Sequence, residues 1–294
     1  MTFSKHKSTC PLCSSKNIAY KYSVNHKSYN FAIYICNDCF FQFMNPCYDK
    51  DSIEKFYTEG YYNGISGFSY VDERLSENFS NYVWDARLKT IRRFSATGNF
   101  LDVGCSFGGF LKRASKYFTP FGIELSKYSS VHAKEFFGSN IWNGTLDDHP
   151  FDYNFFSVIT MIELIEHIEY PVVTLQECYN LLKPGGLLVI QTANFDGWQA
   201  ENEGLRYHYY LPGHLSYFNE TNLSGSLMMI GFRMVMPFFP TDFGVIPKLL
   251  KSRGSFKNFF DYLKWMKIIS YHFKSKIRIC GKPLTSSMVI YAIK

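Results

Sequence analysis

The chain has 294 residues, 46% of them hydrophobic, and a net charge of +6. It is long enough to bury one full domain and a small second module. No apolar run approaches the roughly 20 residues that a membrane span needs, and the N-terminus lacks the apolar core of a signal peptide. We therefore expect a cytoplasmic protein whose eight cysteines are not paired in disulfides.

Four cysteines near the N-terminus form two C-x-x-C pairs, Cys10 with Cys13 and Cys36 with Cys39. Four thiolates in this pattern are typical of a closed, tetrahedral zinc site with a structural role. The segment between the pairs contains two strand-like stretches, so we predict a zinc ribbon over residues 1–50. A redox role for the pairs would need a βαβ context, and none surrounds them.

Residues 51–95 are predicted to form a linker and a helical lid. The aromatic runs over residues 40–46 (FFQFMNP) and 56–62 (FYTEGYY) resemble the leader of bacterial methyltransferases found among surface-sugar and natural-product enzymes. Residues 76–94 carry apolar side chains partly at helical spacing, which predicts a helix. In the enzymes that the leader resembles, such a helix covers the cofactor.

Residues 100–111 (FLDVGCSFGGFL) have the pattern of a strand, a glycine-rich turn and the start of a helix. Gly104 and Gly108 lack the Cβ atom that would keep a nucleotide-like ligand from the backbone. The carboxylate of Asp102 would repel a pyrophosphate but suits the sulfonium and ammonium groups of S-adenosylmethionine. The stretch resembles motif I (D-x-G-x-G-x-G) of the class I S-adenosylmethionine-dependent methyltransferases, with Ser106 in place of the middle glycine.

Residues 119–124 (TPFGIE) predict a second strand that ends in Glu124. A carboxylate there can accept hydrogen bonds from both ribose hydroxyls, a feature that dinucleotide-binding folds share. The resemblance to the methyltransferases implies a set of cofactor-binding residues after the first three strands, namely Asp102, Gly104, Ser106, Gly108, Glu124, Leu125, Thr145 and Leu146.

Residues 157–162 and 187–192 predict two more buried, parallel strands. The helix predicted between them, over residues 172–182, is ended by Lys-Pro-Gly-Gly at 183–186. Alternating strands and helices predict an α/β, Rossmann-like, seven-stranded and mostly parallel sheet with helices on both faces over residues 96–294. The order of the motifs resembles the class I methyltransferase family across roughly residues 96–240.

The run MIELIEHI over residues 161–168 places Glu163, Glu166 and His167 at positions i, i+3 and i+4, which share one face of a helical turn. Two carboxylates and an imidazole suit a divalent cation. With His214 they resemble the metal-binding residues of small-RNA 2′-O-methyltransferases, and the first segment also resembles ubiquinone-pathway O-methyltransferases. The resemblance implies that these four residues bind Mg²⁺ or Mn²⁺ and the substrate hydroxyls.

Two other interpretations of these residues remain open. They can line the cofactor pocket or cap a helix without a metal. Alternatively, His214 is a general base, because its H-L-S-Y-F context resembles that of sugar C-methyltransferases with a zinc-bearing N-terminus. Those enzymes have a further long C-terminal domain that this chain lacks, and Gly213 replaces the acid that precedes their histidine.

Residues 241–283 contain ten basic and two acidic residues, a net charge of +8 in a chain whose total is +6. Apolar residues alternate with the charges partly at helical spacing, so we predict a helical insertion before a last strand over residues 287–292. It is either a solvated pair of helices or a docking site for an anionic acceptor, a membrane surface or RNA.

The sequence thus predicts a methyltransferase that uses S-adenosylmethionine, carries structural zinc and methylates an oxygen of a small-molecule or carbohydrate acceptor, assisted by Mg²⁺ or Mn²⁺. The alternatives are a sugar C-methyltransferase, an RNA methyltransferase and a binding protein on a decayed enzyme fold. Nucleic acid is the less favoured partner, because the positive charge is local. The intact Asp102, Gly104, Gly108 and Glu124 argue against a decayed site.

Overall fold

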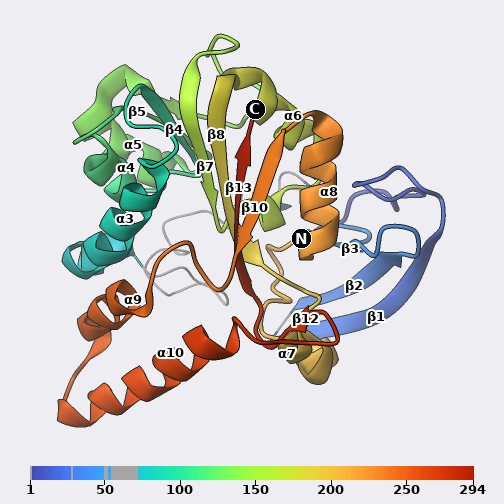
Figure 1. The fold of residues 1–294 in the computed structure, drawn as a ribbon. Helices are drawn as coiled ribbons and strands as arrows, with labels where there is room; N and C mark the ends of the chain where they lie inside the picture. The colour runs from blue at the N-terminus through green and yellow to red at the C-terminus, as the bar shows by residue number, and fades with distance from the viewer. Residues whose placement is uncertain (1, 28, 50–51, 54–71) are drawn as a thin grey trace.

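A computed structural model describes residues 2–27, 29–49, 52–53 and 72–294 (Figure 1). The predicted leader segment at residues 56–62, and with it most of the predicted linker, lies outside the described residues. Within them, two sheets carry the architecture. One is the central sheet of seven strands, and the other has four strands and contains the N-terminal module.

The central sheet has the strand order β10-β13-β8-β7-β4-β5-β6. Five strands from β6 to β8 run parallel, whereas β13 is antiparallel to both of its neighbours. This confirms the predicted Rossmann-like α/β fold. The strands are β4 (Asn99–Val103), β5 (Thr119–Glu124), β6 (Ile141–Asn143), β7 (Phe156–Ile162), β8 (Leu182–Ala193), β10 (Met234–Phe238) and β13 (Ser287–Ile293).

Helices cover both faces of this sheet, because successive side chains of a strand point to opposite faces. Phe100 and Val158 point to one face and pack with α3, α4 and α5, whereas Leu101 and Ile159 point to the other and pack with α6 and α8 (Figure 1). The helices are α3 (Glu77–Ile91), α4 (Gly109–Ala114), α5 (Lys127–Phe137), α6 (Pro171–Leu181) and α8 (Glu220–Ile230).

The N-terminal module is a hairpin of β1 (Ile18–His26) and β2 (Tyr29–Cys36), followed by β3 (Gln42–Met44). Its fourth strand is β9 (Ser216–Tyr217), which comes from far along the chain and pairs with β3. The helix α7 (Trp198–Glu203) and the 3-10 helix that follows it (Gly204–Arg206) lie beside this four-stranded sheet (Figure 1). The module is therefore joined to the larger domain by a shared sheet.

The predicted insertion is helical and lies between β10 and β13. It consists of α9 (Val245–Ser252) and α10 (Leu263–Lys274), with a small hairpin of β11 (Arg278–Ile279) and β12 (Lys282–Pro283) after them. Because β10 runs parallel to β8, the chain enters α9 at the carboxyl edge of the sheet. Among the described helices, none is long and apolar enough to cross a membrane.

Candidate active site

The glycine-rich turn joins β4 to α4 in a left-handed backbone conformation. Gly104, Ser106 and Gly108 have φ angles of 77°, 50° and 80°. A Cβ atom at Gly104 would lie 3.1 Å from Leu164, so glycine permits close packing there. Ser106 adopts its φ without that freedom, at a cost of about 1–3 kcal/mol. Backbone strain of this kind clusters at ligand sites. Because the strained Ser106 lies between β4 and α4, we interpret the turn from Gly104 to Gly108 as a ligand-binding site and call it the cradle.

The Ser106 hydroxyl adds a second observation at the turn. Its Oγ is buried and has no hydrogen-bond partner among the described residues. A buried hydroxyl without a partner carries a desolvation penalty of about 1–3 kcal/mol. A ligand that hydrogen-bonds Ser106 would remove that penalty.

Two buried carboxyl groups end the strands beside this turn. The Asp102 side chain accepts a hydrogen bond from Thr160 Oγ1 at 2.5 Å. The Glu124 side chain accepts hydrogen bonds from the backbone N–H groups of Ser106 and Ser126, each at 2.8 Å. Burial raises the pKa of Glu124, and burial followed by the charge of Glu124 raises the pKa of Asp102 to about 7. Both groups would gain from a cationic ligand.

The remaining predicted cofactor residues also follow strands of the central sheet. Leu125 comes directly after β5, and its backbone carbonyl accepts a hydrogen bond from Asn143 Nδ2 at 3.1 Å. Thr145 and Leu146 follow β6. The Thr145 backbone N–H donates to Asp148 at 2.8 Å. All three residues lie at the carboxyl edge, where parallel sheets bind ligands.

The sequence did not indicate two residues that reach this turn from the lid. Glu73 accepts a hydrogen bond from the Gly109 backbone N–H at 3.3 Å. Burial raises its pKa to about 7. Trp84 of α3 packs so closely that a Cβ atom at Gly109 would lie 2.4 Å from its ring. Neither residue belongs to a recognisable sequence motif. Their contacts with Gly109 depend on how α3 and the 3-10 helix before it pack against the turn, which the sequence does not reveal.

An acid–histidine cluster lies after β7 at the same edge of the sheet. The ligand atoms of Glu166, His167 and His214 lie within 4.8 Å of one another. Glu166 is buried; its Oε2 accepts a hydrogen bond from Thr192 Oγ1 at 2.9 Å, whereas its Oε1 has no partner among the described residues. A buried carboxylate oxygen aimed at two imidazoles is an arrangement that suits a bound cation.

Backbone carbonyls fix the tautomers of both histidines. The Nδ1 atoms of His167 and His214 lie 2.8 Å from the carbonyl oxygens of Gly213 and Tyr209, so we assign a proton to each Nδ1. Each neutral ring then carries its lone pair on Nε2. Burial lowers the pKa of His167 to about 4 and that of His214 well below its usual value. Neutral imidazoles held in this way are the form that binds metals.

Glu163 lies outside this cluster, and the predicted helical turn begins too late to include it. The turn is the 3-10 helix η4 (Ile165–His167), and Glu163 precedes it with a φ of 53°. This left-handed residue turns the chain, so Glu163 does not share a helical face with Glu166. Its Oε1 accepts a hydrogen bond from Gln191 Nε2 at 2.5 Å. Its charge adds to burial in raising the pKa of Glu166.

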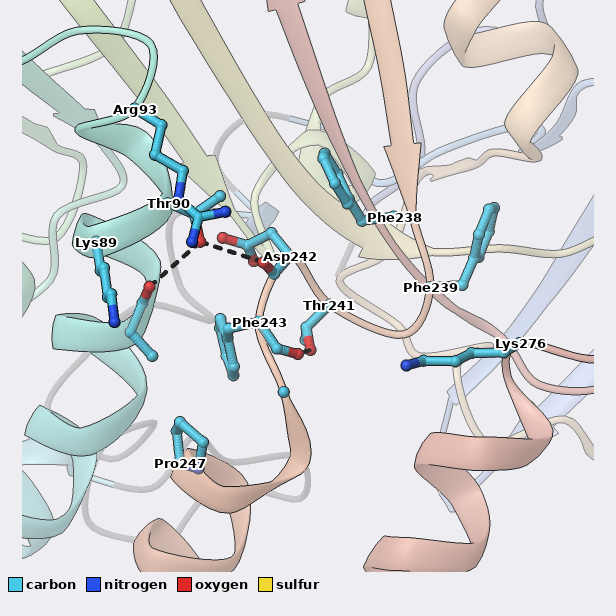
Figure 2. A pocket seen from close by; sticks show the side chains of 12 residues that line it. Lys89, Thr90, Arg93, Phe238, Phe239, Thr241, Asp242, Phe243, Pro247 and Lys276 are labelled. Atoms are coloured by element: carbon cyan, nitrogen blue, oxygen red, sulfur yellow. Dashed lines mark hydrogen bonds between the residues drawn. The ribbon is translucent and has the colours of Figure 1, made fainter.

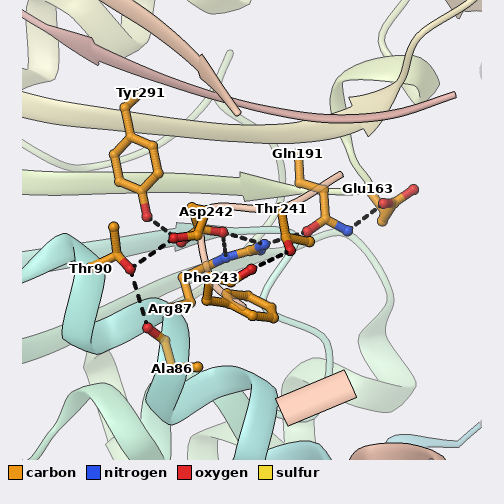
Figure 3. A network of polar contacts seen from close by, with 9 residues as sticks. All are labelled: Ala86, Arg87, Thr90, Glu163, Gln191, Thr241, Asp242, Phe243 and Tyr291. Atoms are coloured by element: carbon orange, nitrogen blue, oxygen red, sulfur yellow. Dashed lines mark hydrogen bonds and ion pairs between the residues drawn. The ribbon is translucent and has the colours of Figure 1, made fainter. Parts of the chain in front are cut away.

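Glu163 belongs instead to a polar network that reaches the lid helix (Figure 3). Gln191 accepts a hydrogen bond from Arg87 at 2.5 Å, and Arg87 forms a buried ion pair with Asp242 at 3.0 Å. The Tyr291 hydroxyl donates to the other oxygen of Asp242 at 2.5 Å. The network thus ties α3, β8 and the start of the insertion together beside the acid–histidine cluster.

Basic residues of the insertion stand near this network. Burial lowers the pKa of Lys248 to about 8, and the charge of Arg87 lowers it further whereas those of Asp242 and Glu163 oppose the change. Burial also lowers the pKa of Lys251. Neither lysine forms an ion pair with another described residue. An anion bound near the polar network would therefore find two ammonium groups to pair with.

A cavity of about 530 Å³ lies on the other side of Asp242, between α3 and the segment that joins β10 to α9 (Figure 2). Lys89 of α3 and Arg93 just after it reach the cavity from one side and Lys276 from the opposite side, and Phe238, Phe239 and Phe243 also line it. It does not include any of the predicted catalytic or cofactor-binding residues.

The four N-terminal cysteines converge as the sequence predicts. Their sulfur atoms lie within 4.8 Å of one another, with Cys10 and Cys39 3.7 Å apart and Cys13 and Cys36 3.6 Å apart. Sulfur atoms at the corners of a zinc tetrahedron lie about 3.8 Å apart, because each Zn–S bond is about 2.3 Å long. All eight cysteines are free of disulfides. The cluster has the dimensions of a zinc site.

Comparisons with known proteins agree with this geometry. Residues 74–236, more than half of the chain, match the family described as "Methyltransferase domain". Over 133 residues the chain is 35% identical to the ubiquinone biosynthesis O-methyltransferase of Parvibaculum lavamentivorans, a match that covers 43% of this chain and 50% of that protein. Over 169 residues it is 31% identical to the same enzyme of Psychrobacter arcticus, covering 50% of this chain and 64% of that one. The chain thus spans less than two thirds of these relatives.

The fold is also similar to a solved structure, that of phosphoethanolamine N-methyltransferase 2 of Haemonchus contortus in complex with S-adenosyl-L-methionine. The TM-score is 0.54 at 16% sequence identity, and the match covers 92% of this chain and 70% of that one. At this identity the likeness concerns the fold alone.

Proposed function

Because the chain belongs to the methyltransferase-domain family, we propose that it transfers a methyl group from S-adenosylmethionine to an oxygen of a small-molecule or glycan acceptor. One observation carries this proposal. The cradle with two buried carboxyl groups and the acid–histidine cluster lie side by side along the carboxyl edge, after the adjacent strands β4 and β7. The names of the relatives in the ubiquinone pathway support oxygen as the methylated atom.

The residues at the cradle fit S-adenosylmethionine. Asp102 and Glu124 supply negative charge for its two cationic groups, and Glu124 keeps lone pairs for the ribose hydroxyls. Ser106 supplies the hydroxyl that otherwise lacks a partner. Gly104 and Gly108 leave the backbone open to the ligand. These residues bind and orient the methyl donor, and orientation for in-line transfer is the main contribution of such a site.

The acid–histidine cluster fits a divalent metal. We propose that Glu166, His167 and His214 hold it, with Thr192 and the carbonyls of Gly213 and Tyr209 orienting these ligands. A divalent ion here would lower the pKa of an acceptor hydroxyl and position it. The identity of the ion, Mg²⁺ or Mn²⁺ in the sequence-based prediction, stays a prediction; two imidazoles also suit softer ions. We propose that Glu163 lies outside the cluster and influences it through its charge, which adds to burial in raising the pKa of Glu166.

His214 has a second possible role without a metal. Its Nε2 lone pair can accept a proton from the acceptor, because Tyr209 holds Nδ1 in the protonated form. This is the general-base role that the sugar C-methyltransferase alternative requires. Its strongly lowered pKa argues against it, because a weak base removes a proton less readily.

The acceptor is proposed to carry an anionic group. Lys248 and Lys251 support this, because two partly desolvated ammonium groups near the polar network of Arg87 and Asp242 gain from a counter-ion. The four-cysteine cluster is proposed to hold one structural zinc ion, which stabilises the module that β9 shares with the larger domain.

Calorimetry tests the proposed methyl donor. S-adenosylhomocysteine should bind the purified chain, Asp102→Asn should weaken binding by at least tenfold, and NAD⁺ should bind neither form. Asp85→Asn is the matched control, because Asp85 lies on the exposed side of α3 and pairs with Arg113. Binding of NAD⁺ without binding of S-adenosylhomocysteine would refute the proposal. Transfer of labelled methyl groups to hydroxylated acceptors then tests the reaction itself.

A further inference from the structure

The insertion displays an unusual surface along the 3-10 helix η7 (Phe259–Tyr262) and α10. Phe259 is 81% exposed, Phe260 76%, Leu263 63% and Met266 69%. Phe273, two helical turns after Met266, is 57% exposed. Single exposed apolar side chains are ordinary, but a contiguous group marks an interaction site. We call this surface, together with Lys267 and Lys274, the α10 face.

Contacts on the opposite side of the helix hold the α10 face in place. Trp265 Nε1 donates a hydrogen bond to Ser252 Oγ of α9 at 3.0 Å, and its ring meets that of Tyr262 with centroids 5.0 Å apart. The Tyr271 hydroxyl lies 3.1 Å from Ser287 Oγ of β13. Because this side is anchored to α9 and β13, the apolar side chains of the α10 face are left exposed to solvent. Figure 1 shows α10 extending away from the central sheet.

Basic side chains and a hollow accompany the apolar ones. Lys267 and Lys274 lie two helical turns apart, on the same side of α10. They form no ion pair with the described residues, whereas Lys264 pairs with Asp261 at 2.7 Å. Both lysines line a hollow of about 390 Å³, together with Met266, Ser270 and Tyr271. Two ammonium groups with the Ser270 hydroxyl beside them suit the oxygen atoms of a phosphate.

We propose that the α10 face docks on a membrane surface rich in anionic phospholipids. The phenylalanines, Leu263 and Met266 would enter the boundary between headgroups and acyl chains, and Lys267 and Lys274 would hold a lipid phosphate in the hollow. This combination of an apolar stripe and lysines is typical of helices that lie in the membrane interface. The net charge of +8 over residues 241–283 complements such a surface.

Charge also decides against the other occupants. A second copy of the chain on the same face would bring lysines against lysines. RNA would match the lysines but would leave Leu263 and Met266 in contact with phosphates and sugars. The chain passes from the carboxyl edge of the sheet into α9 and then α10. Docking of the α10 face would therefore bring the membrane to the side of the molecule that carries the acid–histidine cluster.

Co-sedimentation of the full chain with vesicles tests the proposal and needs no methyl acceptor. The chain should bind vesicles of phosphatidylglycerol and phosphatidylcholine, and bind phosphatidylcholine alone far more weakly. Binding should weaken as salt is raised. Lys267→Gln and Lys274→Gln should each weaken binding roughly fivefold, and the double variant Leu263→Ser/Met266→Ser should abolish it. All variants should keep the melting temperature of the parent chain, because the changed side chains are exposed.

Matched controls use exposed residues elsewhere. Met229→Ser on α8, where Met229 is 88% exposed, and Lys116→Gln after α4 should bind vesicles like the parent chain. Equal binding by all variants, or no binding to anionic vesicles at low salt, would overturn the proposal. Three further results would also overturn it: the chain binds inorganic phosphate but no anionic vesicles, the same variants abolish RNA binding without affecting vesicles, or they convert a dimer to a monomer without affecting vesicles.

Discussion

His167 and His214 meet edge to face, with ring centroids 4.7 Å apart, although 46 residues of chain separate them. The contact arises because the loop before β9 passes directly over η4, where the Leu215 backbone N–H donates to the Glu166 carbonyl at 2.7 Å. The same crossing supplies the Gly213 carbonyl that fixes His167. The same loop therefore brings the two histidines together and supplies the backbone carbonyls of Tyr209 and Gly213 that orient both of them.

Removal of divalent metal should abolish methyl transfer if the cluster holds an ion. Treatment with EDTA should inactivate the chain, and a divalent ion should restore activity. Glu166→Gln should weaken metal binding by about 10–100-fold or more, since it removes a charged ligand. The measurement is calorimetry with Mn²⁺, which reports binding independently of activity.

Glu177→Gln is the matched control for the metal site, because Glu177 lies on α6, outside the cluster, and contacts His149. It should leave metal affinity within a few-fold of the parent. If His214 acts as a general base instead, EDTA has no effect and His214→Ala loses roughly 10²–10⁴ in rate with cofactor affinity unchanged. Full activity of both Glu166→Gln and His214→Ala would refute both roles.

Cofactor affinity should depend on pH through Asp102. Burial raises the pKa of Asp102 to about 7 in the cofactor-free protein, and a cationic ligand favours the ionised form. Protons therefore compete with the cofactor below pH 7, and affinity should fall as the pH is lowered from 8 to 6. Calorimetry over this range checks it. Glu73, with a pKa of about 7, contributes to the same trend. Glu73→Gln should flatten the trend in part, and Asp102→Asn should flatten it further.

Stability of the cofactor-free chain should change with pH in the opposite sense to cofactor affinity. A carboxyl group whose pKa is raised on folding contributes stability below its unfolded pKa, and that contribution is lost as the pH rises through the folded pKa. For Asp102 this window runs from the ordinary aspartate pKa of 3.8 to about 7. Asp102→Asn should therefore raise the midpoint of urea unfolding at pH 8 while it weakens cofactor binding. A lowered midpoint at pH 8 would contradict the prediction.

One zinc ion per chain should accompany the purified protein. Cys36→Ser should lose it and lower the melting temperature, because four thiolates supply folding energy to the small module. Cys280→Ser is the control, since Cys280 is exposed and distant in sequence from the cluster. Elemental analysis is the measurement. A metal-free chain with four reactive thiols in the folded state would rule the site out.

Breaking the buried ion pair between Arg87 and Asp242 should destabilise the fold strongly. The two side chains are 4% and 0% exposed, so Asp242→Asn leaves the Arg87 charge buried without its counter-ion. We expect a loss of about 3–5 kcal/mol in the free energy of unfolding. The exposed pair of Arg113 and Asp85 is the control; Asp85→Asn should cost about 0–1 kcal/mol. Urea denaturation distinguishes the two.

The sequence by itself determined the features that depend on neighbouring residues. The strand, glycine turn and helix around Gly104 are local, so residues 100–111 predicted both the fold and the cradle. The alternation of strands and helices predicted the sheet, and the motifs predicted that Asp102 lies on one strand and that Glu124 ends the next strand of the chain. Two C-x-x-C pairs predicted the four-cysteine cluster, because each pair places two thiolates on one tight turn.

The tertiary structure decided whatever depends on segments distant in the chain. Glu163 and Glu166 have the spacing of a helical face, but the left-handed backbone at Glu163 keeps Glu163 out of the helical turn. The packing of the loop before β9 brings His214 to Glu166. Asp242 reaches Arg87 across 155 residues. Ser216 and Tyr217 complete a sheet that begins at residue 18. No local pattern encodes such contacts, because they follow from which surfaces bury each other when the chain folds.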